Sequence, residues 1–102
     1  MNTYIWEYKV KKDQISKFTD IYGSNGLWEQ LFRFNKGYIK TELHRDLSNR
    51  NRFISIDYWE SKLEYDEFRS NYKNEFEILD EECENLTEKE DFIGSFEKLI
   101  KK

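Results

Sequence analysis

The stretch Phe53-Ile-Ser-Ile-Asp-Tyr-Trp59 runs straight into Glu-Ser61-Lys-Leu-Glu64, and this junction decides the fold. From Phe53 to Trp59 the side chains alternate with the period of two that is typical of a β-strand. Ser61 and Glu64 then make the Ser-x-x-Glu pattern of a capping box, which predicts the start of a helix. The sequence therefore predicts a strand that passes directly into a helix.

Hydrophobic spacing on either side of this junction predicts the remaining elements. Apolar residues at steps of three and four predict a helix that ends at Gly23 in a left-handed conformation, then a short helical piece over 27–32. A long apolar stripe predicts one unbroken helix over 61–86, and residues 86–90 are expected to interrupt the pattern. Further strands are expected where aromatic and branched residues gather, over residues 3–10, 37–46 and 91–97.

Residues 46–51 form a polar turn cluster, which predicts that the second and third strands make an antiparallel hairpin. The register that gathers apolar residues on a common face pairs Leu43 with Ile54, Thr41 with Ile56 and Ile39 with Tyr58. On the opposite face this register pairs Tyr38 with Trp59, Lys40 with Asp57, Glu42 with Ser55 and His44 with Phe53. We therefore expect an ion pair between Lys40 and Asp57.

The predicted order of elements is β-α-β-β-α-β. With right-handed crossovers, this order gives the ferredoxin-like arrangement, a four-stranded antiparallel sheet with both helices on one face. A chain of 102 residues has the length of one domain, so residues 1–102 are expected to form a single α+β domain.

Composition restricts the classes of partner. The net charge is −4 at pH 7 and basic residues do not gather into a stripe, so nucleic acid is not an expected partner. No stretch approaches the length of a membrane span and no signal segment opens the sequence, which predicts a cytoplasmic protein without membrane contact. Cys83 is the only cysteine, so we expect a buried thiol in a reducing compartment.

Both faces of the predicted sheet carry large residues, although two helices cover only one face. In the first strand Ile5 lies on one face, and the other face carries Tyr4, Trp6, Tyr8 and Val10. An exposed apolar face on the order of several hundred Å² is rare on monomers. We therefore expect a homodimer whose subunits meet through their sheets.

Three features together resemble the antibiotic biosynthesis monooxygenase family of dimeric α+β barrels. They are the β-α-β-β-α-β order, the aromatic first strand and the pattern Trp59-x-Ser61-x-x-x-Tyr65-x-x-Phe68, and the resemblance covers nearly the whole chain. The family includes cofactor-independent oxygenases of polycyclic aromatic substrates, haem-degrading oxygenases and proteins with no known activity. The resemblance implies a ligand cavity between the sheet and the helices of each subunit.

Three residues are candidates for catalysis. Trp59 matches the family's Trp at the end of the third strand, so the resemblance implies that it lines the cavity; the alternative is a core Trp. His44, the only histidine, suits a general acid or base, although a place near a hairpin end also suits an exposed residue. Asp57 could act as a base in the cavity, with an ion pair to Lys40 as the structural alternative.

Six aromatic residues are candidates for the walls of a ligand pocket, with core packing as the alternative for each: Trp6, Tyr8, Trp28, Tyr38, Tyr65 and Phe68. Haem degradation in the family uses a histidine on the long helix, and residues 61–86 contain none, so the haem reading is disfavoured. One His and one Cys without paired spacing do not predict a metal site. We expect neither a cofactor nor a metal.

Two functions from different classes remain open. The first is a cofactor-independent monooxygenase acting on a small flat aromatic molecule, in which His44 or Asp57 removes a proton and the resulting carbanion reacts with oxygen. The second is a non-catalytic dimeric binding or stress-related module, whose cavity holds a hydrophobic ligand or is filled by side chains. An open cavity faced by His44 or Asp57 would favour the enzyme, and a filled interior would favour the module.

Overall fold

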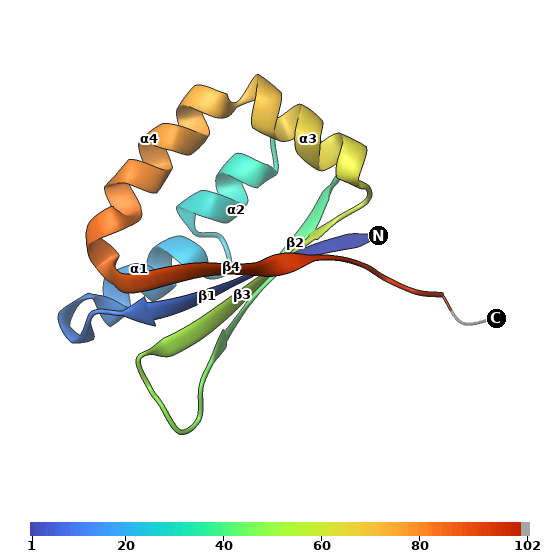
Figure 1. Ribbon diagram of the computed structural model, residues 1–102. Coiled ribbons are helices and arrows are strands. Elements are labelled where there is room, and N and C mark those ends of the chain that lie inside the picture. The colour runs from blue at the N-terminus through green and yellow to red at the C-terminus, as the bar shows by residue number, and fades with distance from the viewer. Residues whose placement is uncertain (101–102) are drawn as a thin grey trace.

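The computed structural model describes residues 1–100 of the 102-residue chain. Within these residues, four strands and four α-helices follow each other in the order β1, α1, α2, β2, β3, α3, α4 and β4 (Figure 1). The strands span Asn2–Val10 (β1), Tyr38–Arg45 (β2), Arg52–Trp59 (β3) and Thr87–Glu97 (β4). The α-helices span Ile15–Tyr22 (α1), Leu27–Phe32 (α2), Lys62–Asn71 (α3) and Lys73–Cys83 (α4), and 3-10 turns lie at Lys12–Gln14 (η1) and Glu84–Leu86 (η2).

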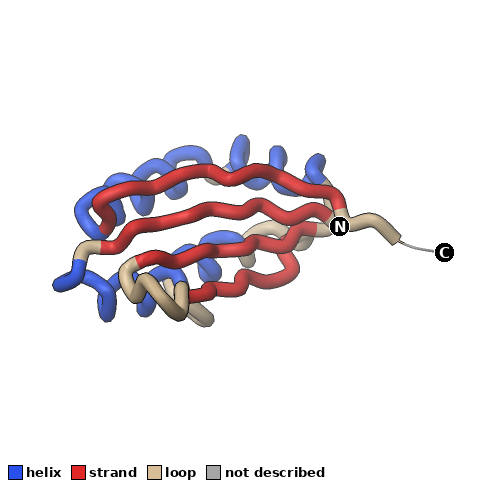
Figure 2. Tube along the Cα trace, turned by 60° about the horizontal axis from the view of Figure 1, so that its bottom comes forward, coloured by secondary structure: helices blue, strands red, loops and turns tan. Residues whose placement is uncertain are grey.

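The strands form one antiparallel sheet in the order β2-β3-β1-β4, which is the ferredoxin-like order. The α+β fold predicted from the sequence is therefore confirmed. Helices α3 and α4 arch over the sheet, and α1 and α2 lie under this arch on the same side (Figure 1). Figure 2 shows the four strands side by side with the helices behind them. We name the face under the helices the inner face and the opposite one the outer face.

The junction after β3 folds as predicted. The Ser61 hydroxyl accepts a hydrogen bond from the Glu64 backbone N–H at 3.3 Å, so the capping box starts α3. Gly23 also ends α1 as predicted, but its backbone is extended (φ −84°, ψ −169°), so the predicted left-handed conformation is wrong. Glycine suits this position because a Cβ atom would lie 2.6 Å from the Thr19 carbonyl oxygen. The left-handed residue of this turn is Asn25, with φ 63°.

The helix predicted over residues 61–86 is divided. It bends at Tyr72, where φ is −119° and ψ is 31°, and a 3-10 turn follows α4. Backbone hydrogen bonds continue through the bend: the Tyr72 N–H donates to the Phe68 carbonyl and the Phe76 N–H donates to the Tyr72 carbonyl, both at 2.9 Å. The helical spacing of the apolar stripe is therefore kept. Phe68 of α3 and Leu79 of α4 are both buried in the core.

The predicted register of the β2–β3 hairpin is correct only at its first pair. Tyr38 pairs with Trp59, but an irregularity between Tyr38 and Lys40 then shifts β2 by one residue. Thr41, instead of Lys40, pairs with Asp57. The physical reason is that a β-bulge adds one residue to a single strand and so reverses which residues face the core.

The same shift removes the predicted ion pair between Lys40 and Asp57. The Lys40 ammonium lies on the outer face, 3.2 Å from Glu42 Oε2 and 4.8 Å from the centre of the Tyr58 ring. Asp57 lies on the inner face, where its carboxyl group accepts a hydrogen bond from the Thr41 hydroxyl. The carboxyl group of Asp57 is thus buried without a cation.

The last strand begins at Thr87, so the predicted interruption over residues 86–90 and the predicted start at residue 91 are wrong. Glu90 pairs with Tyr8 and Lys89 with Lys9, within the β1–β4 ladder. β4 is an edge strand, where charged side chains reach solvent and are well tolerated. An irregularity in its pairing with β1 accompanies Gly94, whose φ of 156° lies in the range that glycine adopts without strain.

The core lies between the inner face and the helices and is mainly aromatic. Its largest fully buried side chains are Trp59, Phe18, Phe53, Phe68 and Val10. Cys83 is buried at its edge, as predicted. The outer face carries apolar side chains as well, which are half-buried: Ile5, Ile54, Ile56 and Tyr58. Of the helices within residues 1–100, none is long and apolar enough to cross a membrane.

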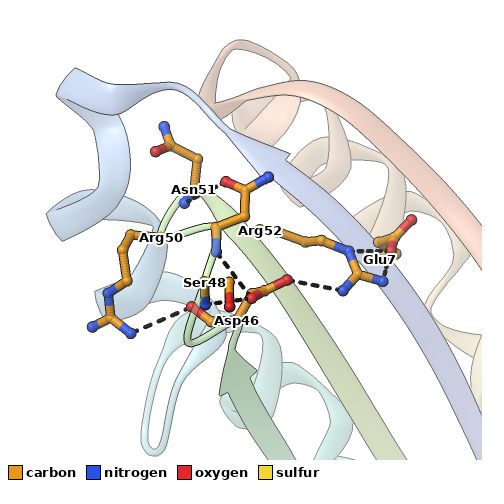
Figure 3. A network of polar contacts seen from close by, with 7 residues as sticks. Glu7, Asp46, Ser48, Arg50, Asn51 and Arg52 are labelled. Carbon is orange, nitrogen blue, oxygen red and sulfur yellow. Dashed lines mark hydrogen bonds and ion pairs between the residues drawn. The ribbon is translucent and has the colours of Figure 1, made fainter.

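A polar network holds the β2–β3 loop to β1 (Figure 3). The Asp46 carboxylate accepts hydrogen bonds from the backbone N–H groups of Ser48 and Asn49, at 2.7 and 2.9 Å. Arg52 then bridges Asp46 Oδ2, at 3.1 Å, and Glu7 Oε2, which accepts from Arg52 Nε at 2.6 Å. These bonds lower the pKa of Asp46, with the two backbone N–H groups as the main cause. The network closes the hairpin end.

Candidate functional site

A cavity of about 280 Å³ lies between the inner face of the sheet and the helices. Every strand and every α-helix contributes to its wall. Seven of the lining residues are aromatic: Trp6, Tyr8, Tyr22, Trp28, Phe32, Tyr65 and Phe76. The remaining lining residues are polar or charged: Thr41, Ser55, Asp57, Arg69, Asp80 and Glu90. We name this space the aromatic cavity.

The floor of the aromatic cavity carries a buried carboxyl group. Asp57 of β3 is 8 % exposed, and Thr41 Oγ1 donates a hydrogen bond to Asp57 Oδ1 at 2.7 Å. Tyr38 lies 2.7 Å from the same Thr41 oxygen, and because the Thr41 proton is used on Asp57, the Tyr38 hydroxyl is the donor. Burial raises the pKa of Asp57 from 3.8 to about 7, and the Thr41 hydrogen bond offsets this only in part.

Aromatic rings pack around the cavity in contact with one another. Tyr8 lies edge-on to Tyr22 at 5.0 Å between ring centres, and Trp28 lies edge-on to Phe76 at 4.9 Å. Burial raises the pKa values of Tyr8 and Tyr22 above their ordinary value of 10, so both hydroxyls stay neutral at physiological pH. The walls therefore offer flat apolar surfaces and neutral hydroxyl groups to a ligand.

Three more charged residues lie on the cavity wall. Arg69 of α3 donates a hydrogen bond from Nη1 to the Tyr65 hydroxyl at 3.0 Å, and its guanidinium carbon lies 3.8 Å from the centre of the Phe76 ring. Asp80 of α4 and Glu90 of β4 are close enough to interact: desolvation raises the pKa of Glu90, and the charge of Asp80 raises it further. The wall of the aromatic cavity therefore carries a positively charged side chain as well as negatively charged ones.

Five of the residues predicted for the site line the aromatic cavity: Asp57, Trp6, Tyr8, Trp28 and Tyr65. They come from strands β1 and β3 and from helices α2 and α3, so the fold brings together residues that are distant in sequence. The ring of Trp6 also contacts the exposed Phe92 ring of β4, at 4.9 Å between ring centres.

The other predicted residues lie elsewhere. His44 is exposed on the outer face, 3.3 Å from Glu42, and so points away from the cavity. Trp59 and Phe68 are fully buried and contact each other in the core at 5.3 Å between ring centres. Tyr38 is connected to the cavity only by the hydrogen bond between its hydroxyl group and Thr41. For these residues the structure favours the packing or surface interpretation.

Sequence reasoning missed several residues of the cavity wall. Thr41 was assigned to the wrong face because the bulge after Tyr38 gives no signal in the sequence. Arg69, Asp80 and Glu90 were not singled out, since charged residues on helices and edge strands are usually solvated. A helical signal existed for one of them: Arg69 is four residues after Tyr65 and therefore on the same helix face.

No metal-binding cluster accompanies the cavity. Within residues 1–100, His, Cys, Asp and Glu side chains nowhere gather in a group of three that could hold a metal ion.

Comparisons with known proteins agree with the fold. The sequence model of the family described as "antibiotic biosynthesis monooxygenase" matches residues 1–75. A search of curated proteins finds no relative that matches the chain.

Solved structures resemble the chain over nearly its whole length. SnoaB, a cofactor-independent oxygenase from Streptomyces nogalater, is 16 % identical with a TM-score of 0.72, and the match covers 98 % of this chain and 94 % of that one. A protein from Pseudomonas aeruginosa is 15 % identical with a TM-score of 0.69, covering 97 % of this chain and 94 % of that one. At these identities the likeness supports the fold and no more.

Proposed function

Because the chain belongs to the antibiotic biosynthesis monooxygenase family, we propose that it is a cofactor-independent monooxygenase-like enzyme that oxidises a small, flat aromatic molecule. The aromatic cavity is the proposed substrate site. Its volume of about 280 Å³ suits a small ligand, and its walls supply the aromatic faces on which a flat ring can stack.

The carboxyl group of Asp57 is the observation that carries this proposal. It is buried in the cavity wall and has a pKa of about 7. A general base works best when its pKa lies near the working pH, because it is then ionised often enough and still binds a proton well. Among residues 1–100, Asp57 belongs to no ion pair, so its charge is free to respond to a ligand.

The proposed reaction needs one proton acceptor and molecular oxygen. Asp57 takes a proton from an activated CH₂ group, which leaves an electron-rich carbanion on the aromatic substrate. The carbanion adds to O₂ and forms a C–O bond, and protonation gives a hydroperoxide. Loss of water from the hydroperoxide breaks the O–O bond and leaves a carbonyl group, so that CH₂ and O₂ become C=O and H₂O.

Oxygen uptake with 1,8-dihydroxyanthrone tests this proposal. The wild-type protein is expected to speed oxidation of the anthrone to the quinone, and Asp57→Asn to lower kcat/KM about 100-fold, because the general base is lost. His44→Ala is the matched control, since His44 is exposed on the outer face, and it is expected to leave the rate unchanged. Binding of the anthrone without oxygen uptake would overturn the enzyme proposal and favour a non-catalytic binding module.

We also propose that the protein is a homodimer joined through the outer face. Half-buried Ile5, Ile54 and Ile56 form an apolar patch across β1 and β3, and Ile5 pairs directly with Ile56. The exposed Phe96 of β4 extends this patch, since it pairs with Thr3 of the same face. A contiguous apolar surface of this kind is suited to burial against a second copy of the chain.

A further inference from the structure

Two side chains of β2 hold the buried carboxyl group of Asp57. Thr41 pairs with Asp57 across the β2–β3 ladder, and its hydroxyl donates a hydrogen bond to Asp57 Oδ1 at 2.7 Å. The Tyr38 hydroxyl lies 2.7 Å from Thr41 Oγ1 and donates to it, because the single Thr41 proton is already used on Asp57. The three groups therefore form a chain of hydrogen bonds with one direction, from Tyr38 through Thr41 to Asp57.

The irregularity of β2 brings the two hydroxyl groups to the same face. In a regular strand, residues three apart point to opposite faces of the sheet. The β-bulge between Tyr38 and Lys40 adds one residue. As a result, Tyr38 pairs with Trp59 and Thr41 pairs with Asp57, both on the inner face. Bulges are common beside active sites, where they redirect a side chain, and this bulge directs Thr41 toward a buried carboxyl group.

Packing fixes the position of the Tyr38 hydroxyl. The Tyr38 ring lies 5.4 Å from the Phe32 ring and 5.5 Å from the fully buried Trp59 ring, measured between ring centres. Burial raises the pKa of Tyr38, so its hydroxyl keeps its proton and remains a donor at physiological pH. Thr41 is β-branched, which restricts the rotation of its side chain. Both donors are therefore held in place when the charge of Asp57 changes.

No other group on the cavity wall takes over the role of Thr41. The titratable and charged residues that line the cavity from the remaining elements are Tyr8 of β1, Tyr22 of α1, Tyr65 and Arg69 of α3, Asp80 of α4 and Glu90 of β4. Within residues 1–100, none of them forms a hydrogen bond or an ion pair with Asp57. The hydroxyl of Thr41 is therefore the group on which the ionised form of Asp57 depends.

We propose that Thr41 and Tyr38 are positioning residues for Asp57, which fix its Oδ1 atom against β2 and leave Oδ2 as the oxygen that takes a proton from a ligand. The inference rests on the proposed function in one respect, that Asp57 acts as a base in the cavity. When the substrate C–H bond breaks, the proton forms an O–H bond with Oδ2 and the electron pair stays on carbon. Oδ1 then remains a carbonyl oxygen that still accepts from Thr41.

The same hydrogen bond controls how many molecules have an ionised base. Burial raises the pKa of Asp57, and the Thr41 hydroxyl limits this rise, so that the pKa is about 7. About half of the molecules then carry an ionised Asp57 at pH 7, whereas a pKa one unit higher would leave about a tenth. Loss of the Thr41 hydroxyl should therefore weaken the base at neutral pH without removing it.

NMR titration of the Asp57 carboxyl carbon tests the role of Thr41 without a substrate, and the Asp57→Asn variant identifies the signal. Thr41→Val keeps the shape of the side chain and removes the hydroxyl. It is expected to raise the pKa of Asp57 by at least one unit, a tenfold loss of preference for the ionised form. Thr41→Ser keeps a hydroxyl and should restore the wild-type titration. Tyr38→Phe should raise the pKa less than Thr41→Val, because its hydrogen bond acts through Thr41.

Two matched controls remove the same kinds of hydroxyl group elsewhere. Thr19→Val removes a hydroxyl of α1 that donates to the Ser16 carbonyl at 2.9 Å. Tyr58→Phe removes a hydroxyl of the outer face that donates to Glu42 at 3.1 Å. Both variants are expected to leave the titration of Asp57 unchanged.

The pH dependence of anthrone oxidation separates positioning from a general loss of structure. The pH at which kcat/KM reaches half its maximum reports the pKa of the base in the free enzyme. In Thr41→Val this pH should rise by the same amount as the pKa of Asp57 in the NMR titration. A purely structural effect would lower kcat/KM at every pH and leave the midpoint where it is.

The inference is overturned if Thr41→Val folds and leaves the pKa of Asp57 unchanged, or if Thr19→Val raises this pKa by the same amount. If Thr41→Val does not fold, Tyr38→Phe decides, and an unchanged pKa of Asp57 in that variant overturns the inference. Failure of the proposed function looks different. In that case the titration of Asp57 depends on Thr41 as expected, whereas the wild-type protein does not oxidise the anthrone.

Discussion

The two faces of the sheet are built from alternate residues of the same strands, yet they place carboxyl groups in opposite environments. On the outer face, Glu7 pairs with Arg52, and Glu42 accepts hydrogen bonds from Lys40 and Tyr58. These contacts lower the pKa of Glu42, with the Lys40 hydrogen bond as the largest cause. On the inner face, the Asp57 carboxyl group accepts a hydrogen bond only from the Thr41 hydroxyl, and burial raises the pKa of Asp57 to about 7.

This difference shows on which face a charged group lowers the free energy of unfolding. Paired charges on a solvated face cost little and contribute little. A buried carboxyl group without a cation is costly, and such groups gather at functional sites. The inner face therefore combines tight aromatic packing with one buried carboxyl group that lacks a cation, and the outer face has neither feature.

Truncation of neighbouring residues on opposite faces should show the largest effect. Phe53 of β3 is 2 % exposed on the inner face, whereas the next residue, Ile54, is half-buried on the outer face. Phe53→Ala is expected to lower the free energy of unfolding by about 3–5 kcal/mol, because it leaves a cavity in the core. Ile54→Ala is expected to cost about 1 kcal/mol. Chemical denaturation at low protein concentration measures both, and equal losses would contradict the contrast between the faces.

The pH dependence of stability should follow Asp57. The folded state keeps the Asp57 proton up to a pKa of about 7, whereas the unfolded chain releases it at the ordinary value of 3.8. The folded state therefore binds more protons between these values, and the free energy of unfolding should fall as pH rises from about 4 to 7 and then level off. Asp57→Asn should remove this fall and stabilise the protein at pH 8 by up to about 4 kcal/mol.

The control for this measurement is Asp66→Asn, which removes an exposed carboxyl group that pairs with Lys62 on α3. It should leave the slope of stability against pH nearly as in the wild type. If the Asp57→Asn variant keeps the wild-type slope of the free energy of unfolding between pH 4 and 7, then the buried Asp57 carboxyl group does not destabilise the folded protein.

Much of the fold could be predicted because local patterns and tertiary packing agree. The alternation over Phe53–Trp59 and the capping box at Ser61 lie where the sequence predicted a strand and a helix start. The hairpin register could not be predicted, because the bulge after Tyr38 depends on how β2 packs against its neighbours. The bend at Tyr72 also escaped prediction, since neither proline nor glycine marks it.

Less of the candidate site could be predicted, because a cavity depends on what packing leaves empty. Trp6, Tyr8 and Trp28 were predicted for the pocket on aromatic character alone, which does not separate them from core residues such as Phe68. Arg69 looks like an ordinary charged residue on a helix until Tyr65 and Phe76 are placed beside it. A one-residue error in register was also enough to give Asp57 a cation that it lacks.

The outer face supplies the last and smallest expected effect. If two copies of the chain meet through the half-buried Ile5, Ile54 and Ile56, then Ile56→Asp places a charge in that interface and should weaken association at least tenfold, which corresponds to about 1.4 kcal/mol. Sedimentation velocity over a range of micromolar concentrations measures the change. Leu63→Asp is the matched control, because Leu63 is 68 % exposed on α3, on the helix side of the sheet. A wild-type protein that stays monomeric throughout this range would remove the dimer and leave the apolar outer face without its proposed cover.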